Sequence, residues 1–166
     1  MTPIRTRFAP SPTGFMHVGG VRTALFAWLL AQKDADDGTF ILRIEDTDKV
    51  REVAGSIEQI EASLKWLGIE WGEGVEVGGP HEPYKQSERL DIYKEWAQKL
   101  VDSGRAYADP YTPVELEAFR DQAKAEKRPF LYRAHRPAEP PVWDGTQPLR
   151  FKSDPKPYTW TDAVMG

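Results

Sequence analysis

A glycine-rich stretch with a single histidine, PSPTGFMHVGG at residues 10–20, is the first feature of this sequence that could do chemistry. It lies between a short apolar stretch and a longer one with helical periodicity. Glycines such as Gly14, Gly19 and Gly20 let a backbone approach a ligand closely. The first turn of a helix also offers free N–H groups and partial positive charge to a phosphate. We therefore predict a nucleotide-binding loop, with His17 beside the phosphates.

The spacing of this loop excludes the two commonest nucleotide motifs. It matches neither G-x-G-x-x-G nor G-x-x-x-x-G-K-[ST], so dinucleotide binding and P-loop hydrolysis are both disfavoured.

Two charged residues stand at the ends of the first two predicted strands. Arg7 is close to the end of the first strand, and Glu45 ends the second. Because neighbouring parallel strands end at the same edge of a sheet, we expect a guanidinium and a carboxylate at one rim, where they suit a zwitterionic ligand. An Arg7–Glu45 salt bridge between the strand ends is the alternative, and the two interpretations are compatible if the ligand inserts between the side chains.

The elements that must position these residues are predicted from apolar periodicity. Residues 4–9 alternate apolar and polar side chains, and residues 39–45 form the short apolar run of a buried parallel strand. Helices are predicted over 18–33, about 53–67, 87–103 and 113–127, with Ser87 as a helix N-cap and a capping box at Thr112, Pro113 and Glu115. Strand, helix, strand, helix is a βαβ pattern, so we predict an α/β fold with a parallel sheet.

The second half of the chain has a different character. Residues 128–147 are rich in proline and have little periodicity, which predicts a loop, and residues 148–154 can return as a strand. The segment 118–136 is the one distinctly basic stretch of a chain whose net charge is −4, and it could follow phosphates or be a solvated helix face. Cysteine is absent, which excludes disulfides and cysteine-ligated metals. No apolar run is long enough to cross a bilayer, so we expect a soluble, cytoplasmic protein without a membrane partner.

Three long segments carry a resemblance to one family. Residues 7–25, RFAPSPTGFMHVGGVRTAL, resemble the HIGH signature of class I aminoacyl-tRNA synthetases and, in this full form, that of the glutamyl-tRNA synthetases. Residues 41–51, ILRIEDTDKVR, and 84–93, YKQSERLDIY, are similar to further signatures of the same family. The resemblance implies the first half of a Rossmann-like catalytic domain over residues 1–106 and part of an inserted subdomain that binds the tRNA acceptor stem over residues 107–166.

The family's activity is the ATP-dependent activation of L-glutamate and its transfer to tRNA(Glu). The resemblance implies catalytic roles for His17, Thr13, Gly19 and Gly20. It implies that ATP, as its Mg²⁺ complex, binds Pro10, Ser11, Pro12, Thr13, Gly14, His17, Gly19 and Gly20. Glutamate would bind Arg7, Ala9, Ser11 and Glu45, and tRNA would bind Arg51.

Some members of the family bind zinc in the insertion through cysteines. Here Asp109 and Tyr111 stand about where those cysteines would be, so we predict no zinc. Gly20 occupies the position of the signature's second histidine. We expect a monomer, and we expect the chain to be a fragment, inactive by itself, because the family continues into a KMSKS-like loop and an anticodon-binding portion.

The alternatives are a glutamyl-queuosine tRNA(Asp) synthetase, a glutaminyl-tRNA synthetase, a small-molecule adenylyltransferase, and a non-catalytic fragment that binds nucleotide or tRNA. PSPTG and RIEDTD differ from the segments expected of a glutamyl-queuosine synthetase, and PSPTG differs from the segment expected of a glutaminyl-tRNA synthetase. A small-molecule adenylyltransferase would not need RIEDTD or the basic insertion.

Overall fold

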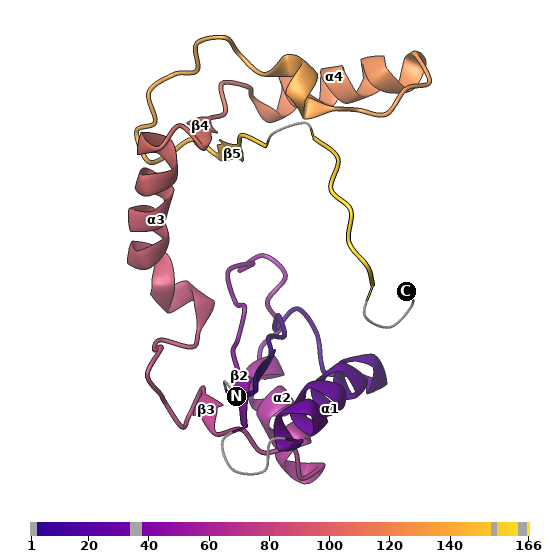
Figure 1. Cartoon of the computed structure of the whole chain (residues 1–166), viewed down its shortest axis with the longest axis vertical. Coiled ribbons are helices and arrows are strands. Elements are labelled where there is room, and N and C mark those ends of the chain that lie inside the picture. The colour runs from indigo at the N-terminus through magenta and orange to yellow at the C-terminus, as the bar shows by residue number, and fades with distance from the viewer. Residues whose placement is uncertain (1–2, 34–37, 154–155, 163–165) are drawn as a thin grey trace. The chain divides into compact units, whose positions relative to one another are not determined.

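The computed structural model describes residues 3–33, 38–153, 156–162 and 166. The chain divides into two compact units, Met1–Leu90 and Asp91–Gly166, shown in Figure 1. The domain boundary predicted after residue 106 falls inside the second unit, within strand β4 (Ala106–Ala108). No helix in the described part of the chain is long and apolar enough to span a membrane.

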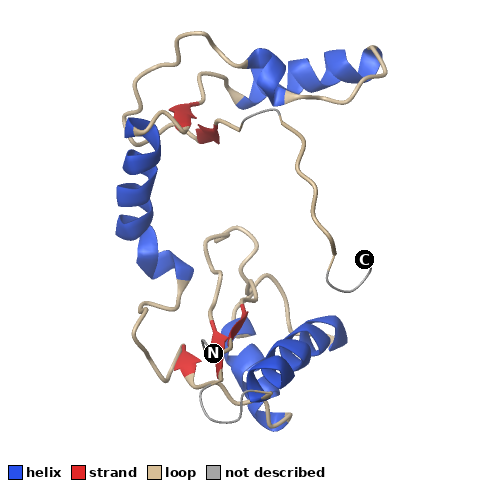
Figure 2. Ribbon diagram, viewed as in Figure 1, coloured by secondary structure: helices blue, strands red, loops and turns tan. Residues whose placement is uncertain are grey.

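The first unit is built on a parallel sheet, as the βαβ pattern predicts. Strands β1 (Arg5–Phe8), β2 (Thr39–Leu42) and β3 (Glu73–Gly74) lie in the order β1–β2–β3, and both pairings are parallel (Figure 2). In the β1–β2 register Arg5 lies beside Thr39 and Phe8 beside Leu42. The two strands therefore end at the same edge of the sheet.

Two helices cover this sheet and share its apolar core. Helix α1 (Val18–Gln32) and helix α2 (Ser56–Trp66) confirm the predicted helices, and Gly68, with φ +71°, follows the second as a left-handed C-terminal residue. The core consists of Phe8, Ala24, Ala31, Phe40, Leu42, Ile44, Ile60, Leu64, Ile69, Trp71, Val75 and Tyr84. The apolar periodicity that predicts the first helix does not identify its buried face, since Leu25 and Leu29 are exposed and the small Ala24 and Ala31 belong to the core instead.

Strand β3 was not predicted from the sequence. It has only two residues, and the segment around it, WGEGVEVGG, contains four glycines at positions 72, 74, 78 and 79. Gly74 has φ +137°, and a Cβ there would lie 2.1 Å from the carbonyl oxygen of Leu42. Tertiary pairing with β2 therefore requires a glycine where local propensity argues against a strand.

A buried carboxylate fixes β3 against β1. Glu73 accepts a hydrogen bond from the Tyr84 hydroxyl at 2.6 Å and forms an ion pair with Arg5. Burial alone raises the pKa of Glu73, but the hydrogen bonds from Tyr84 and Arg5 outweigh it, so the pKa lies below its ordinary value. The carboxylate is therefore held in its charged form at the edge of the sheet.

The second unit contains two helices and a small antiparallel sheet. Helix α3 (Leu90–Asp102) follows a 3-10 turn, η1 (Gln86–Arg89), and helix α4 (Pro113–Ala125) begins with the predicted capping box. A second 3-10 turn, η2 (Tyr132–His135), precedes the proline-rich loop. Strand β5 (Leu149–Phe151), expected from the sequence, pairs with β4, which was not expected (Figure 2).

A polar network replaces a large apolar core in this unit. Asp109 is buried, and its carboxylate accepts hydrogen bonds from the Tyr111 N–H at 3.0 Å, from Arg150 Nε at 2.7 Å and from the Tyr132 hydroxyl. The Arg150 guanidinium also lies 4.0 Å from the centre of the Tyr132 ring. Burial raises the pKa of Asp109, but the donors from Tyr132, Tyr111 and Arg150 outweigh it and lower the pKa.

We predict that Asp109→Asn destabilises the β4–β5 sheet at neutral pH by about 2 kcal/mol, because the charge that Arg150 and Tyr132 hydrogen-bond is lost. The folded-state pKa lies below the ordinary value of 3.8, so the carboxylate contributes stability above about pH 4 and loses it as the pH falls through the folded-state value. Amide hydrogen exchange of Ala106–Ala108 measures both effects: protection falls on acidification in the original chain and depends less on pH in the variant.

The matched control is Asp144→Asn. Asp144 also has a lowered pKa from hydrogen bonds to Thr146, but it lies in an exposed loop, so β4 exchange should stay within error. Equal effects of the two substitutions on β4 would show that the Asp109 network does not hold the sheet.

Candidate nucleotide and amino-acid site

The loop between β1 and α1 surrounds a cavity at the carboxyl edge of the sheet. The cavity has a volume of about 290 Å³. Its lining includes most of the predicted ATP-binding residues, namely Pro10, Ser11, Thr13, Gly14, His17 and Gly20. Phe8, Phe15, Met16 and Ile60, which were not predicted, complete the lining. Of the predicted ATP-binding residues, Pro12 is buried behind this lining and Gly19 lies in the first turn of α1. The glycine-bearing loop is therefore open to a ligand and not filled by packed side chains.

His17 is the N-cap of helix α1. Its Nδ1 accepts a hydrogen bond from the Gly19 N–H at 3.1 Å, and its backbone carbonyl accepts one from Val21 at 3.1 Å. A neutral imidazole that accepts at Nδ1 carries its proton on Nε2. The exposed ring therefore presents a donor, Nε2–H, at the helix N-terminus.

Further donors surround the histidine. The N–H groups of Val18 and Gly20 make no hydrogen bond within the described part of the chain. Together with the helix dipole they form the kind of site that binds anions. Gly20 lines the cavity, and a Cβ there would lie 3.2 Å from Met16 Cγ, so a larger residue at this position would crowd Met16.

Two residues of α2 hold this loop, and sequence reasoning missed both. The fully buried Ser56 hydroxyl donates to the carbonyl of Gly14 at 2.5 Å. The Gln59 side-chain oxygen accepts from the N–H of Met16 at 2.8 Å, and its amide nitrogen donates to Ser63. The sequence contained one signal for the role of Ser56. This residue lies four residues before Ile60 and eight before Leu64, so a polar side chain stands on the apolar face of the helix, where it needs a hydrogen-bond partner.

The predicted glutamate-binding residues lie along the adjoining strand ends. Arg7 is exposed on β1 beside Ile41, Ser11 lines the cavity, and Ala9 lies between them in sequence. The N–H of Glu45 donates to the carbonyl of Pro10 at 2.9 Å, which places Glu45 beside the loop. The alternative prediction, a salt bridge between Arg7 and Glu45, is wrong, since no such ion pair forms among the described residues. The Glu45 carboxylate instead lies 4.0 Å from the guanidinium of Arg43.

The acidic loop after β2 is anchored by a buried aspartate. The Asp46 carboxylate accepts from the N–H of Ser87 at 2.9 Å and from its hydroxyl at 2.6 Å, and it pairs with Lys49 at 3.3 Å. Burial raises the pKa of Asp46, but the Ser87 and Lys49 hydrogen bonds outweigh it and lower the pKa. The prediction that Ser87 caps a helix is therefore wrong, because its side chain is used by Asp46.

Arg51, the predicted tRNA contact, lies on the same loop. It is exposed and forms an ion pair with Asp48 at 2.6 Å. An ion pair this exposed contributes little stability, so the guanidinium can exchange Asp48 for a phosphate.

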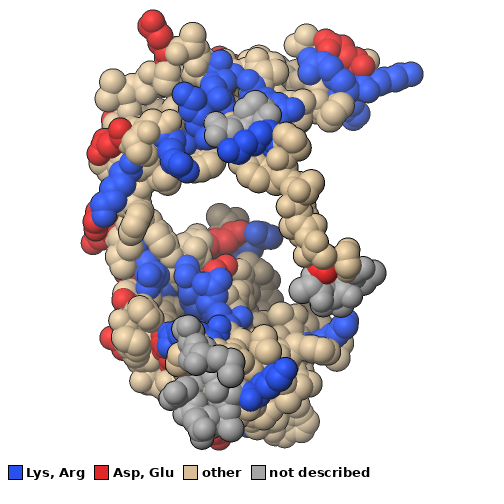
Figure 3. Space-filling model, viewed as in Figure 1, with Lys and Arg blue, Asp and Glu red and all other residues tan. Residues whose placement is uncertain are grey.

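The basic stretch of the second unit is partly neutralised by its own chain. Figure 3 shows Lys and Arg side chains gathered on the visible face of this unit. Within α4 and the turn after it, Arg120 pairs with Glu117 at 2.9 Å, and Arg128 pairs with Glu126. In the described part of the chain no group of three or more His, Asp or Glu side chains is placed to hold a metal ion.

The sheet, the loop and the histidine cap define a class I synthetase fold, and comparison with known proteins agrees. Residues 3–166 match the family described as tRNA synthetases class I (E and Q), catalytic domain, and the chain belongs to that family.

Glutamate–tRNA ligases are among the relatives that the chain resembles. It is 57% identical over 129 residues to glutamate–tRNA ligase 2 of Rubrobacter xylanophilus, an alignment that covers 78% of this chain and 26% of the relative. It is 50% identical over 165 residues to the glutamate–tRNA ligase of Anaeromyxobacter dehalogenans, covering 98% and 34%. The crystal structure of a glutamate tRNA ligase from Elizabethkingia meningosepticum, in complex with its amino acid, matches with a TM-score of 0.72 and 47% identity, covering 78% and 26%. The chain thus spans about a third or less of the length of these proteins.

We predict that Gly19→Ala disturbs the histidine cap. A Cβ at Gly19 would lie 2.8 Å from His17 Cε1 and 3.1 Å from Nδ1, so the ring must turn away and the cap hydrogen bond is lost. The expected cost is about 1 kcal/mol of helix stability. NMR would show faster exchange of the residue-19 amide and a shifted His17 Nδ1 resonance. Gly14→Ala is the control, since a Cβ there meets nothing within 4 Å, and an unmoved Nδ1 resonance in Gly19→Ala would contradict the cap.

We also predict that Ser56→Ala loosens the loop. The Gly14 carbonyl loses its donor, and exchange of the Met16 amide, which Gln59 protects, should become about tenfold faster, a change of about 1.4 kcal/mol. Ser103→Ala removes a similar hydroxyl-to-carbonyl hydrogen bond on the exposed end of α3 and serves as the control. Met16 exchange that is the same in both variants would show that α2 does not position the loop.

Proposed function

We propose that this chain is the ATP-binding part of a glutamate–tRNA ligase, which activates L-glutamate with ATP and transfers it to tRNA(Glu). The observation that carries the proposal is the open cavity that His17 and Gly20 line at the N-terminus of α1, with His17 Nε2–H and the free N–H groups of Val18 and Gly20 as donors in the first turn of that helix. The names of the relatives support the choice of amino acid. The chain is a part of that enzyme, and it is not expected to complete the reaction by itself.

The proposed chemistry is adenylate formation. A carboxylate oxygen of glutamate attacks the α-phosphorus of ATP, an O–P bond forms, and pyrophosphate leaves with the electrons of the broken P–O bond. Negative charge grows on the phosphate oxygens, and fixed N–H donors stabilise it without reorganising. His17 and the first-turn amides supply such donors, while Thr13, Gly19 and Gly20 shape the contact. ATP arrives as its Mg²⁺ complex.

The glutamate pocket is proposed beside the loop, along the strand ends. Arg7 is exposed and has no acidic partner among the described residues, so its guanidinium is free to bind a carboxylate through two parallel hydrogen bonds. Glu45 would accept the α-ammonium, and Ala9 and Ser11 would line the space between. Alignment of the reacting carboxylate with the α-phosphate is then set by the β1–β2 pairing.

The tRNA is proposed to contact Arg51 and the inserted segment 107–166. The segment's cations that lack an internal partner would bind phosphates, and the ion-paired Arg120 and Arg128 would contribute less.

We predict distinct kinetic effects for two substitutions in the full-length protein. His17→Ala should lower the rate of adenylate formation about 10²-fold with little change in glutamate affinity, because a donor to the transition state is lost. Arg7→Ala should mainly raise the KM for glutamate. ATP–pyrophosphate exchange in the presence of tRNA(Glu) measures both.

Lys65→Ala is the matched control, since Lys65 pairs with Glu76 on the surface away from the loop and its loss should change neither parameter. Equal loss of every parameter in His17→Ala and Arg7→Ala would indicate misfolding, and unchanged exchange in His17→Ala would refute the assignment.

A further inference from the structure

A cavity in the second unit is lined by residues of α3, β4 and the proline-rich loop. Its volume is about 440 Å³, within the range of small-molecule sites. All of its lining residues come from residues 98–152, so the second unit alone forms it. None of the roles proposed above uses the cavity itself, although Arg136 and Lys152 in its lining belong to the segment whose unpaired cations are proposed to bind tRNA.

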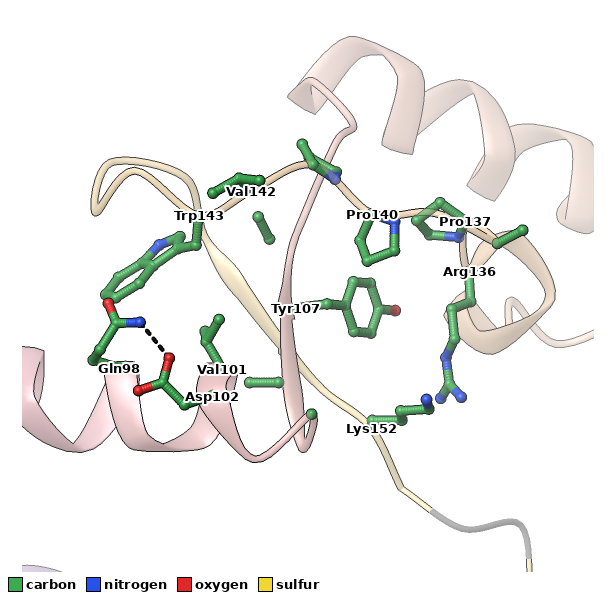
Figure 4. Close-up of a pocket in the computed structure, with 15 residues that line it drawn as sticks. Gln98, Val101, Asp102, Tyr107, Arg136, Pro137, Pro140, Val142, Trp143 and Lys152 are labelled. Atoms are coloured by element: carbon green, nitrogen blue, oxygen red, sulfur yellow. Dashed lines mark hydrogen bonds between the residues drawn. The ribbon is translucent and has the colours of Figure 1, made fainter.

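The walls of this cavity are mostly apolar and aromatic. Tyr107 of β4 is buried, and Pro140 and Pro137 of the loop lie next to its ring, while Val142 lies near Trp143 (Figure 4). The indole of Trp143 is fixed at one end, because its Nε1–H donates to the carbonyl of Gln147 at 3.0 Å. Fixed rings and prolines lose little conformational freedom when a flat apolar group binds against them.

The two ends of the cavity differ in charge. Figure 4 shows Arg136 and Lys152 together at one end, beside the Tyr107 hydroxyl, with Trp143 and Gln98 at the other. Neither cation belongs to an ion pair in the described part of the chain. At the opposite end the Asp102 carboxylate accepts a hydrogen bond from Gln98 at 2.7 Å.

Arg136 carries the strongest indication of a missing partner. Its Nε is buried and has no hydrogen-bond partner among the described residues. Its guanidinium lies 5.8 Å from the centre of the Tyr107 ring, which orients the charge but satisfies none of its N–H groups. A buried donor without an acceptor is costly, and a guanidinium that has no acceptor among the described residues favours an anion at this end of the cavity.

We propose that this cavity binds a small organic anion with a flat apolar body, its carboxylate or phosphate held by Arg136 and Lys152 and its body against Tyr107 and Trp143. The polarity of the cavity fixes the orientation, since Asp102 repels an anionic group from the other end. The site is separate from the nucleotide loop and does not depend on the ligase activity.

The test is an NMR titration of the whole chain with three probes of one shape: 1-naphthylacetate, 1-naphthyl phosphate and the uncharged 1-naphthylacetamide. Both anions are expected to shift the Trp143 indole N–H and the Tyr107 amide with dissociation constants below about 1 mM, and the amide to bind at least about tenfold more weakly. Tighter binding of the phosphate identifies a phosphate ester as the natural class, and tighter binding of the acetate identifies a carboxylate.

Arg136→Gln should weaken both anions at least about tenfold, whereas Arg133→Gln, an exposed neighbour outside the cavity lining, should not. Arg136→Lys keeps the charge and should retain part of the affinity, which separates a lost charge from a lost fold. Equal affinity for the acetate and the acetamide, full affinity in Arg136→Gln, shifts confined to residues 10–20, or no shift up to about 10 mM would each overturn the proposal.

Discussion

Parallel pairing of β1 with β2 is the constraint on which the candidate site depends. The pairing continues beyond the strands, since Arg43 donates to the carbonyl of Phe8 at 3.0 Å and Glu45 to that of Pro10 at 2.9 Å. The segments that follow β1 and β2 therefore leave the sheet side by side. The first continues into the loop that contains His17, and the second continues into the loop that contains Asp46 and Asp48. A ligand at this edge can contact the helix N-terminus and both strand ends at once, as the proposed adenylate formation requires of its two substrates.

The loop itself is held from several sides without being closed. Ser56 and Gln59 fix its backbone from α2, and the His17 ring ties it to the first turn of α1. These bonds occupy backbone groups of Gly14, Met16 and Gly19, while the donors of Val18, Gly20 and the imidazole Nε2 are left for a ligand. Fixing the loop in advance reduces the cost of ordering it when a phosphate binds.

The second unit is stabilised by a buried polar network and not by a large apolar core. Its buried apolar residues are few and mostly small, and the Asp109 carboxylate organises the sheet, the η2 turn and the start of α4 through Arg150, Tyr132 and Tyr111. Around it, Tyr111, Phe119, Phe130 and His135 form edge and stacked ring contacts. A charged network of this kind is sensitive to losing one partner, which an apolar core of the same size would tolerate better.

Local signals in the sequence, namely apolar periodicity, the glycines and the capping box, were enough to predict the parallel α/β fold of the first unit, helices α1, α2, α3 and α4, and the position of the glycine-bearing loop between β1 and α1. The sequence by itself did not determine strands β3 and β4, the Asp46–Ser87 contact or the hold of Ser56 and Gln59 on the loop. Each of these joins residues far apart in the chain. Only the folded structure, through the depth of burial and the direction of single hydrogen bonds, decided that Ser87 serves a carboxylate, that Glu45 lies beside Arg43 and not paired to Arg7, and that Arg136 is left with an unsatisfied donor.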